Sequence, residues 1–186
     1  MSKIKLIGEA ARRSSKPLAM TPGSVRNDAL YSVGEKILGN LDLILEANSK
    51  DVEAAGKNGL AESSIDRLLL TEDRLKSIVS DINNVISLQD PLGVMFDMKN
   101  MPNGLQIGKK RVPLGVIGVI YESRPNVTVD ISILCIKSGN AAILRGGSES
   151  FNSNLALGSV IRDGLEVCGI NKDAVQVIQD KDRALV

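Results

Sequence analysis

The sequence predicts an α/β fold in which N-terminal helices and a projecting hairpin precede half of a doubly wound parallel sheet. Three changes of pattern along the chain support this prediction. Apolar residues first recur every three or four positions, then two extended segments flank an Asn-Gly turn, and finally short apolar runs alternate with helical stretches. With 186 residues, 43% of them apolar, the chain is long enough to bury one substantial core.

The first part, residues 1–90, is predicted to be helical. Thr21-Pro22 supplies an N-cap and a first-turn proline for a helix that Gly39-Asn40 is expected to bend or split. A short helix is expected over residues 63–70, and Thr71 is expected to cap a longer helix. Together these helices would pack around the sheet through their apolar faces.

Residues 91–113 are predicted to form a β-hairpin. The extended segments Val94–Lys99 and Leu105–Val112 flank Pro102-Asn103-Gly104, and Asn-Gly between two such segments is a strong hairpin signal. The basic residues of the hairpin have two interpretations. A solvated or interfacial hairpin is preferred to a phosphate-binding cluster for these residues, which are Lys99, Lys109, Lys110 and Arg111.

Residues 114–186 are predicted to form a βαβαβ unit, which is one mononucleotide-binding half of a Rossmann-like sheet. The apolar segment Gly115–Tyr121 is expected to be a strand buried on both faces. The elements that follow it are expected at Val127–Lys137 (helix), Ala141–Leu144 (strand), Ser148–Val167 (helix) and Val175–Ile178 (strand).

Composition argues against several classes of function. The net charge of +1 gives no broad field to attract nucleic acid or an anionic membrane, and four aromatic residues (two Tyr, two Phe) cannot form a base-stacking platform. A chain without histidine has no imidazole for a metal centre or a general base, so we expect no metal. The N-terminus resembles neither a secretory signal nor a membrane span, which favours a cytoplasmic protein.

A glycine-rich turn, Arg145-Gly146-Gly147-Ser148, follows the second predicted strand and opens a helix. The two glycines can let a ligand approach the backbone, while the helix N-terminus presents free N–H groups to an anion and Ser148 can cap the helix. The same turn can also serve tight packing alone, and both interpretations stay open.

A second polar segment, Tyr121 to Asn126, lies at the carboxyl end of the first predicted strand, the edge where open α/β sheets bind ligands. Pro125 keeps the chain extended before the helix, and Asn126 is a natural N-cap for that helix. Arg124 can guide an anionic substrate, or it can pair with Glu122.

The segment from Val112 to Ser150, VPLGVIGVIYESRPNVTVDISILCIKSGNAAILRGGSES, closely resembles the core signature of the γ-glutamyl phosphate reductase family, part of the aldehyde dehydrogenase superfamily. The resemblance runs from Ile4 to the last residue and covers the N-terminal part of the family's chain. It implies an aldehyde-dehydrogenase-like fold and NADPH-dependent reduction of γ-glutamyl phosphate to glutamate 5-semialdehyde and phosphate in proline biosynthesis. It also implies a homo-oligomer in which the hairpin helps to join subunits.

The resemblance also implies roles for particular residues. Asn126, in the Pro-Asn pair, would donate its amide to the oxyanion formed when a cysteine attacks the acyl carbon. Arg145 stands where the superfamily has a lysine that contacts the adenine ribose, and a guanidinium can pair with the extra phosphate of NADPH. Beside these roles, the position of Arg124 makes it a candidate to guide the carboxylate or the phosphate of the substrate. The residues expected to bind NADPH or NADP are Tyr121, Glu122, Arg145, Gly146, Gly147 and Ser148.

The nucleophilic cysteine of the family lies in the part that follows the resemblance. We therefore expect the catalytic cysteine domain to be absent from this chain, and the chain to be a fragment that is inactive alone. Cys135 and Cys168 lie in apolar stretches and are expected to be buried packing residues. The alternative hypothesis is a noncatalytic nucleotide-binding or assembly module that pairs with a separate chain.

Overall fold

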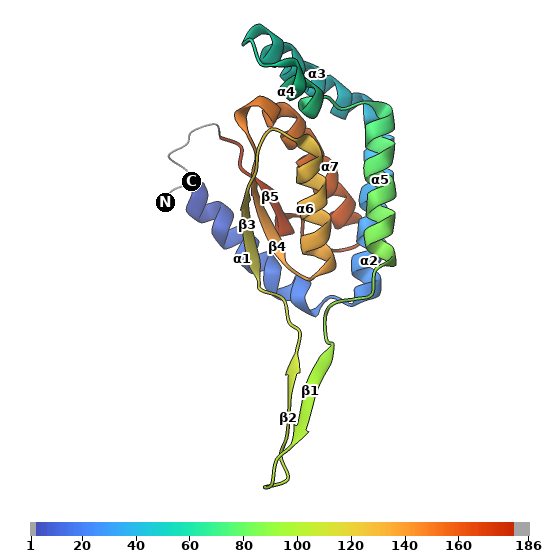
Figure 1. Ribbon diagram of the computed structural model, residues 1–186, viewed down its shortest axis with the longest axis vertical. Coiled ribbons are helices and arrows are strands. Elements are labelled where there is room, and N and C mark those ends of the chain that lie inside the picture. Colours follow the sequence, from blue (N-terminus) through green and yellow to red (C-terminus); the bar gives the residue numbers. More distant parts are fainter. Residues whose placement is uncertain (1–2, 181–186) are drawn as a thin grey trace.

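The computed structural model describes residues 3–180 and consists of a helical body around a small sheet, from which a hairpin projects (Figure 1). No helix in this described range is long and apolar enough to cross a membrane. The elements in chain order are α1 (Lys3–Met20), α2 (Gly23–Gly39), α3 (Leu41–Lys57), α4 (Glu62–Leu68), α5 (Glu72–Ser87), β1 (Met95–Asn100), β2 (Gln106–Lys110), β3 (Val116–Ile120), α6 (Pro125–Lys137), β4 (Ala141–Arg145), the 3-10 turn η1 (Ser148–Ser150), α7 (Phe151–Val167), the 3-10 turn η2 (Lys172–Ala174) and β5 (Val175–Val177).

The sheet is parallel, in the order β3-β4-β5, and its strands are joined by α6 and α7. These two helices pack on one face, and α1 packs against the strands on the other (Figure 1). This is the predicted βαβαβ order, since each crossover between parallel strands needs a helix to return the chain.

The main core lies between the sheet and the helices α2, α5, α6 and α7. Gly164 of α7 lies directly against Val33 of α2. A Cβ atom at Gly164 would come within 2.8 Å of the Val33 Cα, so the two helix backbones cross without an intervening side chain. This crossing fixes α7, and with it the turn that precedes α7.

The helix ends confirm two of the expected signals and contradict a third. Thr71 caps α5 by accepting a hydrogen bond from Arg74 N at 3.2 Å, and the chain breaks between α2 and α3 at Gly39-Asn40, as predicted. The predicted Thr21 cap is wrong. Pro22 stands at the N-cap position of α2, and the Thr21 hydroxyl donates back to the Pro17 carbonyl at 3.0 Å.

The prediction that the first strand is buried on both faces is also wrong. Within the described residues β3 pairs on one side, with β4, and Ile120 at its end is 68% exposed. An apolar run is compatible with a central strand and with an edge strand. The run alone does not indicate how many neighbouring elements will cover the strand, and so it does not determine how deeply the strand is buried.

The predicted hairpin is confirmed. β1 and β2 pair antiparallel, and Gly104 adopts a positive φ of 82° at the turn, a conformation that glycine adopts without a steric penalty. Part of the basic flank is used inside the hairpin, since Lys109 pairs with Asp97 at 2.8 Å and lies 5.8 Å from the centre of the Phe96 ring.

Candidate functional site

The carboxyl edge of the sheet brings the two polar segments of the sequence together. Tyr121 N donates to the Arg145 carbonyl at 3.0 Å, and beyond this bond the Ser123 hydroxyl donates to Glu149 at 2.6 Å. The loop after β3 therefore lies directly beside the glycine-rich turn after β4, as expected for parallel strands that end at one edge.

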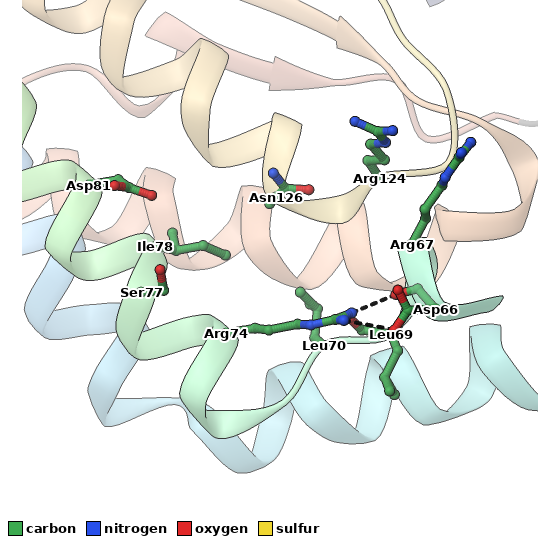
Figure 2. Close-up of a pocket in the computed structure, with 10 residues that line it drawn as sticks. All are labelled: Asp66, Arg67, Leu69, Leu70, Arg74, Ser77, Ile78, Asp81, Arg124 and Asn126. Carbon is green, nitrogen blue, oxygen red and sulfur yellow. Dashed lines mark hydrogen bonds and ion pairs between the residues drawn. The ribbon is translucent and has the colours of Figure 1, made fainter. Parts of the chain in front are cut away.

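Two adjoining cavities open at this edge. The first, about 330 Å³, lies between α4, α5 and the β3–α6 loop (Figure 2), and the second, about 380 Å³, lies beside the glycine-rich turn. Arg67 and Arg124 line both. The first cavity is further lined by Asp66, Leu69, Leu70, Arg74, Ser77, Ile78, Asp81 and Asn126, and the second by Leu60, Ser64, Glu122, Ser123, Gly147 and Glu149.

Asn126 lies in the first turn of α6 and lines the first cavity. It is not the N-cap of this helix, as one prediction held, because Pro125 already occupies the first turn and Arg124 stands at the N-cap position. Its Nδ2 donates one hydrogen to Asp130 Oδ2 at 3.2 Å. An amide nitrogen carries two hydrogens, so the other can serve a ligand.

Asp130 orients the Asn126 amide. Partial burial, and then the nearby charge of Asp81, raise the pKa of Asp130, while the hydrogen bond from Asn126 opposes that rise. A carboxylate accepts hydrogen bonds, and an amide oxygen cannot donate one. The Asn126 amide must therefore turn its nitrogen, and not its oxygen, toward Asp130.

Arg124 lines both cavities and does not pair with Glu122, the alternative that the sequence left open. Within residues 3–180 its guanidinium forms no ion pair or hydrogen bond, and the same is true of Arg67. Arg74, on the opposite wall, is engaged with the Asp66 carboxylate at 2.8 Å and with the Leu69 carbonyl at 2.8 Å (Figure 2).

Gly146 and Gly147 of the turn lack room for a side chain for different reasons. A Cβ atom at Gly146 would come within 2.1 Å of Asn154 Nδ2 and 3.1 Å of the Tyr121 ring, so Gly146 is required for packing. Gly147 borders the second cavity, and a Cβ atom there would come within 2.6 Å of the Ser123 hydroxyl oxygen. Of the two, Gly147 is therefore placed to border a ligand.

A buried row of hydrogen bonds supports the turn from below. The Tyr121 hydroxyl lies 2.6 Å from Thr128 Oγ1, Thr128 donates to Asn154 Oδ1 at 2.9 Å, and Asn154 donates to Ser150 Oγ at 2.9 Å. Burial raises the pKa of Tyr121, and its bond to Thr128 opposes the rise. The Tyr121 hydroxyl is thus directed inward, and this residue supports the turn through its ring and its internal bond.

In the first turn of α7, the N–H groups of Asn152 and Ser153 are already engaged within the protein. Asp51 of α3, 3% exposed, accepts from the backbone N of Asn152 at 3.1 Å and of Ser153 at 2.7 Å, and from their side chains at 2.8 and 2.6 Å. Ser148 does not cap the helix, since its hydroxyl donates to Glu149. The carboxylate of Asp51 therefore holds the first turn of α7, which follows the turn Arg145-Gly146-Gly147-Ser148 where the anion was expected.

Asn48, one turn before Asp51, extends this contact to the first cavity. Its amide donates to the Leu68 carbonyl at 2.8 Å and to Ser153 Oγ at 3.0 Å, and its carbonyl accepts from Leu70 N at 2.7 Å. The sequence holds one signal for this pair. Asn48 and Asp51 follow Ile44 at spacings of four and seven, on the stripe of α3 that faces the core.

The cavity beside Gly147 offers polar groups to a ligand, whereas the start of α7 is occupied by Asp51. The Ser123 hydroxyl and the Glu122 carboxylate can bind ribose hydroxyl groups, and Gly147 borders the same space. The guanidinium of Arg145 adjoins this turn, where its Nη1 donates to the Gly146 carbonyl at 2.8 Å.

No protein-family model matches the chain. Two curated proteins named gamma-glutamyl phosphate reductase align with nearly all of it. The one from Shewanella amazonensis is 52% identical over 180 residues, which are 97% of this chain, and the one from Shewanella woodyi is 49% identical over 183 residues, or 98%. The chain is homologous to gamma-glutamyl phosphate reductases. It spans 43% of the length of each of these two relatives.

Solved structures of gamma-glutamyl phosphate reductases share the fold. The Thermotoga maritima enzyme superimposes with a TM-score of 0.96 at 40% identity, over 99% of this chain and 44% of the enzyme. The Saccharomyces cerevisiae enzyme gives 0.91 at 34% identity, over 100% of this chain and 48% of the enzyme. A probable aldehyde dehydrogenase from Listeria monocytogenes, with a TM-score of 0.72 at 14% identity, shows that the fold is aldehyde-dehydrogenase-like.

The two cysteines of this reductase homologue lie in unreactive surroundings. Cys135 is 5% exposed, and burial raises its pKa to about 11. Cys168 is half-buried rather than buried, a correction to the expectation, and burial together with the charge of Asp28 raises its pKa. Since the thiolate is the nucleophile, a raised pKa leaves little of the reactive form near neutral pH.

We expect a maleimide to label Cys168 well before Cys135 near neutral pH. The pKa of Cys135 predicts labelling about a hundredfold slower than that of an unperturbed thiol, before its burial is considered. Mass spectrometry of the labelled peptides over time measures both rates, and the urea-unfolded chain, in which the two rates should converge, is the control. Rapid labelling of Cys135 in the folded chain would show that it is an accessible, activated thiol.

Proposed function

We propose that this chain supplies the first part of a γ-glutamyl phosphate reductase, which reduces γ-glutamyl phosphate with NADPH to glutamate 5-semialdehyde and phosphate in proline biosynthesis. In this proposal residues 1–90 are the helical part of the cofactor domain, residues 91–113 are a hairpin that joins subunits, and residues 114–186 are the first half of the NADP-binding sheet. The observation that carries the proposal is the cavity in which Asn126 and Arg124 meet at the carboxyl edge of the sheet.

Asn126 stabilises the oxyanion in this scheme. A cysteine thiolate, from the segment of the longer reductases that follows this one, attacks the acyl carbon and leaves negative charge on its oxygen. The free hydrogen of the Asn126 amide donates to that oxygen, while Asp130 holds the other hydrogen. Such a donor stabilises the transition state more than the ground state, because the charge is greatest there.

NADPH, bound beside Gly147, would supply the hydride that reduces the acyl group. Glu122 and Ser123 would orient its ribose, and Arg145 would pair with the additional phosphate that distinguishes NADPH from NADH. The internal row from Tyr121 to Ser150 would keep the turn in place beneath it.

A hybrid enzyme tests the proposal. In it, this chain replaces the matching segment of the Shewanella amazonensis reductase, with which it shares 52% identity. We expect the hybrid enzyme to oxidise glutamate 5-semialdehyde with NADP in a reaction that requires inorganic phosphate, the reverse of the biosynthetic direction, as followed by NADPH absorbance. A hybrid that is folded by circular dichroism and gel filtration, but shows no phosphate-dependent turnover, would refute the proposed function.

Arg145→Ala in the hybrid enzyme should weaken NADPH binding more than NADH binding. The expected difference is about 1–3 kcal/mol, the range for a charge-assisted hydrogen bond to a phosphate. Fluorescence titration with each cofactor measures it, and Arg13→Ala on the exposed side of α1 is the matched control. Equal losses for the two cofactors would remove the phosphate contact from the proposal.

A further inference from the structure

We propose that Arg67 and Arg124 together form an anion site that binds the phosphoryl group of the acyl phosphate substrate. This inference rests on the proposed function and adds to it a second cation, Arg67, from a part of the chain that no sequence motif marks. It also assigns the phosphoryl group, rather than the carboxylate of the glutamyl chain, to this pair.

The position of the two arginines supports one shared site. Arg67 lies near the end of α4 and Arg124 in the loop after β3, yet each lines both cavities, so both lie where the cavities adjoin. Figure 2 shows the two side chains extending to the same side of the view, away from Arg74. An anion bound where the cavities adjoin would be attracted by both positive charges.

The carboxylates nearby do not satisfy this pair. Asp66 is engaged with Arg74 at 2.8 Å, and Glu149 accepts hydrogen bonds from Ser123 and Ser148. Glu122 and Asp81 line the cavities without an ion pair to either arginine within residues 3–180. Within residues 3–180, the N–H donors of the Arg67 and Arg124 guanidinium groups therefore remain available to a ligand.

The distance along the substrate favours the phosphoryl group. In an acyl phosphate a single oxygen joins the phosphorus to the acyl carbon, whereas the α-carboxylate of a γ-glutamyl group lies at the far end of its carbon chain. In the proposed function the Asn126 amide donates a hydrogen bond to the acyl oxygen. Arg124, two residues earlier, lines the same cavity. The group next to Asn126 on the side of the arginines is therefore the phosphoryl group.

The chemistry of the step uses this charge. As the thiolate adds and the tetrahedral intermediate collapses, the bond between the acyl carbon and the bridging oxygen breaks, and its electron pair stays on phosphate, which then takes up a proton. Negative charge on the leaving group grows during this step. Guanidinium groups match phosphate oxygens in a bidentate geometry and stabilise the growing charge.

The reverse reaction of the hybrid enzyme measures this site directly, because inorganic phosphate is then a substrate. We expect Arg67→Gln and Arg124→Gln each to raise the KM for inorganic phosphate by roughly tenfold or more, the usual effect of losing a charge-assisted contact. The KM values for NADP and for the semialdehyde should stay within about twofold. Arg13→Gln, which removes the same charge from exposed α1, should change none of the three.

Three kinetic results would overturn the inference. A rise in the KM for NADP instead of phosphate would assign the arginines to the cofactor, and a rise in the KM for the semialdehyde would assign them to the carboxylate. Unchanged constants in an active hybrid enzyme would also overturn it and leave the proposed function standing.

A binding measurement on the 186-residue chain tests the anion site independently of the proposed reaction. Inorganic phosphate, added against sodium chloride at matched ionic strength, should shift the Nε–Hε resonances of Arg67 and Arg124 in nitrogen-proton NMR spectra, and that of Arg13 much less. If the hybrid enzyme is inactive while these resonances shift, the anion site stands and the proposed reaction fails. If phosphate does not move them, the anion site fails.

Discussion

Asn126→Ala is expected to lower the kcat of the hybrid enzyme by about 10²–10³-fold, the effect of removing one oxyanion donor. The tetrahedral intermediate is the same in both directions of the reaction, so the loss should appear in semialdehyde oxidation as well. KM values should change little, because the amide acts on charge that develops after the substrate binds. Steady-state kinetics of the variant and the parent hybrid measure both constants.

Two further variants test whether the loss of kcat is specific to the Asn126 amide. Asn83→Ala on the exposed side of α5 removes the same side chain away from the cavity and should leave kcat unchanged. Asp130→Asn keeps the shape of the residue that orients Asn126 and should give a smaller loss than Asn126→Ala. A higher KM at unchanged kcat for Asn126→Ala would contradict the oxyanion role and indicate a contact made with the bound substrate.

Asp51→Ala is expected to lower the free energy of unfolding of the chain by about 2–4 kcal/mol, well above the typical effect of a helix cap. The carboxylate is buried and accepts four hydrogen bonds at the start of α7, so its removal leaves buried donors without an acceptor. Equilibrium urea denaturation, followed by circular dichroism, measures the change in unfolding free energy.

The matched control is Glu53→Ala on the same helix. Glu53 is exposed and pairs with Lys57 on the surface, so this variant should unfold at the urea concentration of the unaltered chain. Asp51→Asn, which retains one acceptor oxygen, should fall between the other two. Similar unfolding for Asp51→Ala and Glu53→Ala would show that the cap contributes little to stability.

The local elements of this fold could be predicted because their signals are short-range. The Asn103-Gly104 turn specifies its hairpin within a few residues, and the alternation of apolar runs with helical stretches specifies βαβαβ. Parallel strands end at one edge, so the meeting of Tyr121–Asn126 with the glycine-rich turn could also be predicted. The exposure of β3 could not, because it depends on neighbours that the strand's own sequence does not encode.

The site residues that the sequence did not predict take their roles from contacts with residues far away along the chain. Asp51 and Ser153 are separated by 102 positions, and a polar residue on a helix stripe does not say which helix it will meet. Arg67 has the pattern of an ordinary exposed helix residue until α4 is placed beside the β3–α6 loop. The resemblance implies that Tyr121 binds the cofactor, and the direction of its hydroxyl depends on Thr128 in the next helix.

The contact made by Asn48 and Asp51 has an evolutionary consequence. Three side chains, Asn48, Asp51 and Ser153, share hydrogen bonds so closely that a change at one position leaves a buried donor or acceptor unsatisfied at another. Single substitutions should therefore be selected against, and lineages that depart from this set should replace its members together. An alignment of homologous reductases should accordingly show these positions covarying, although more than a hundred residues separate the first from the last.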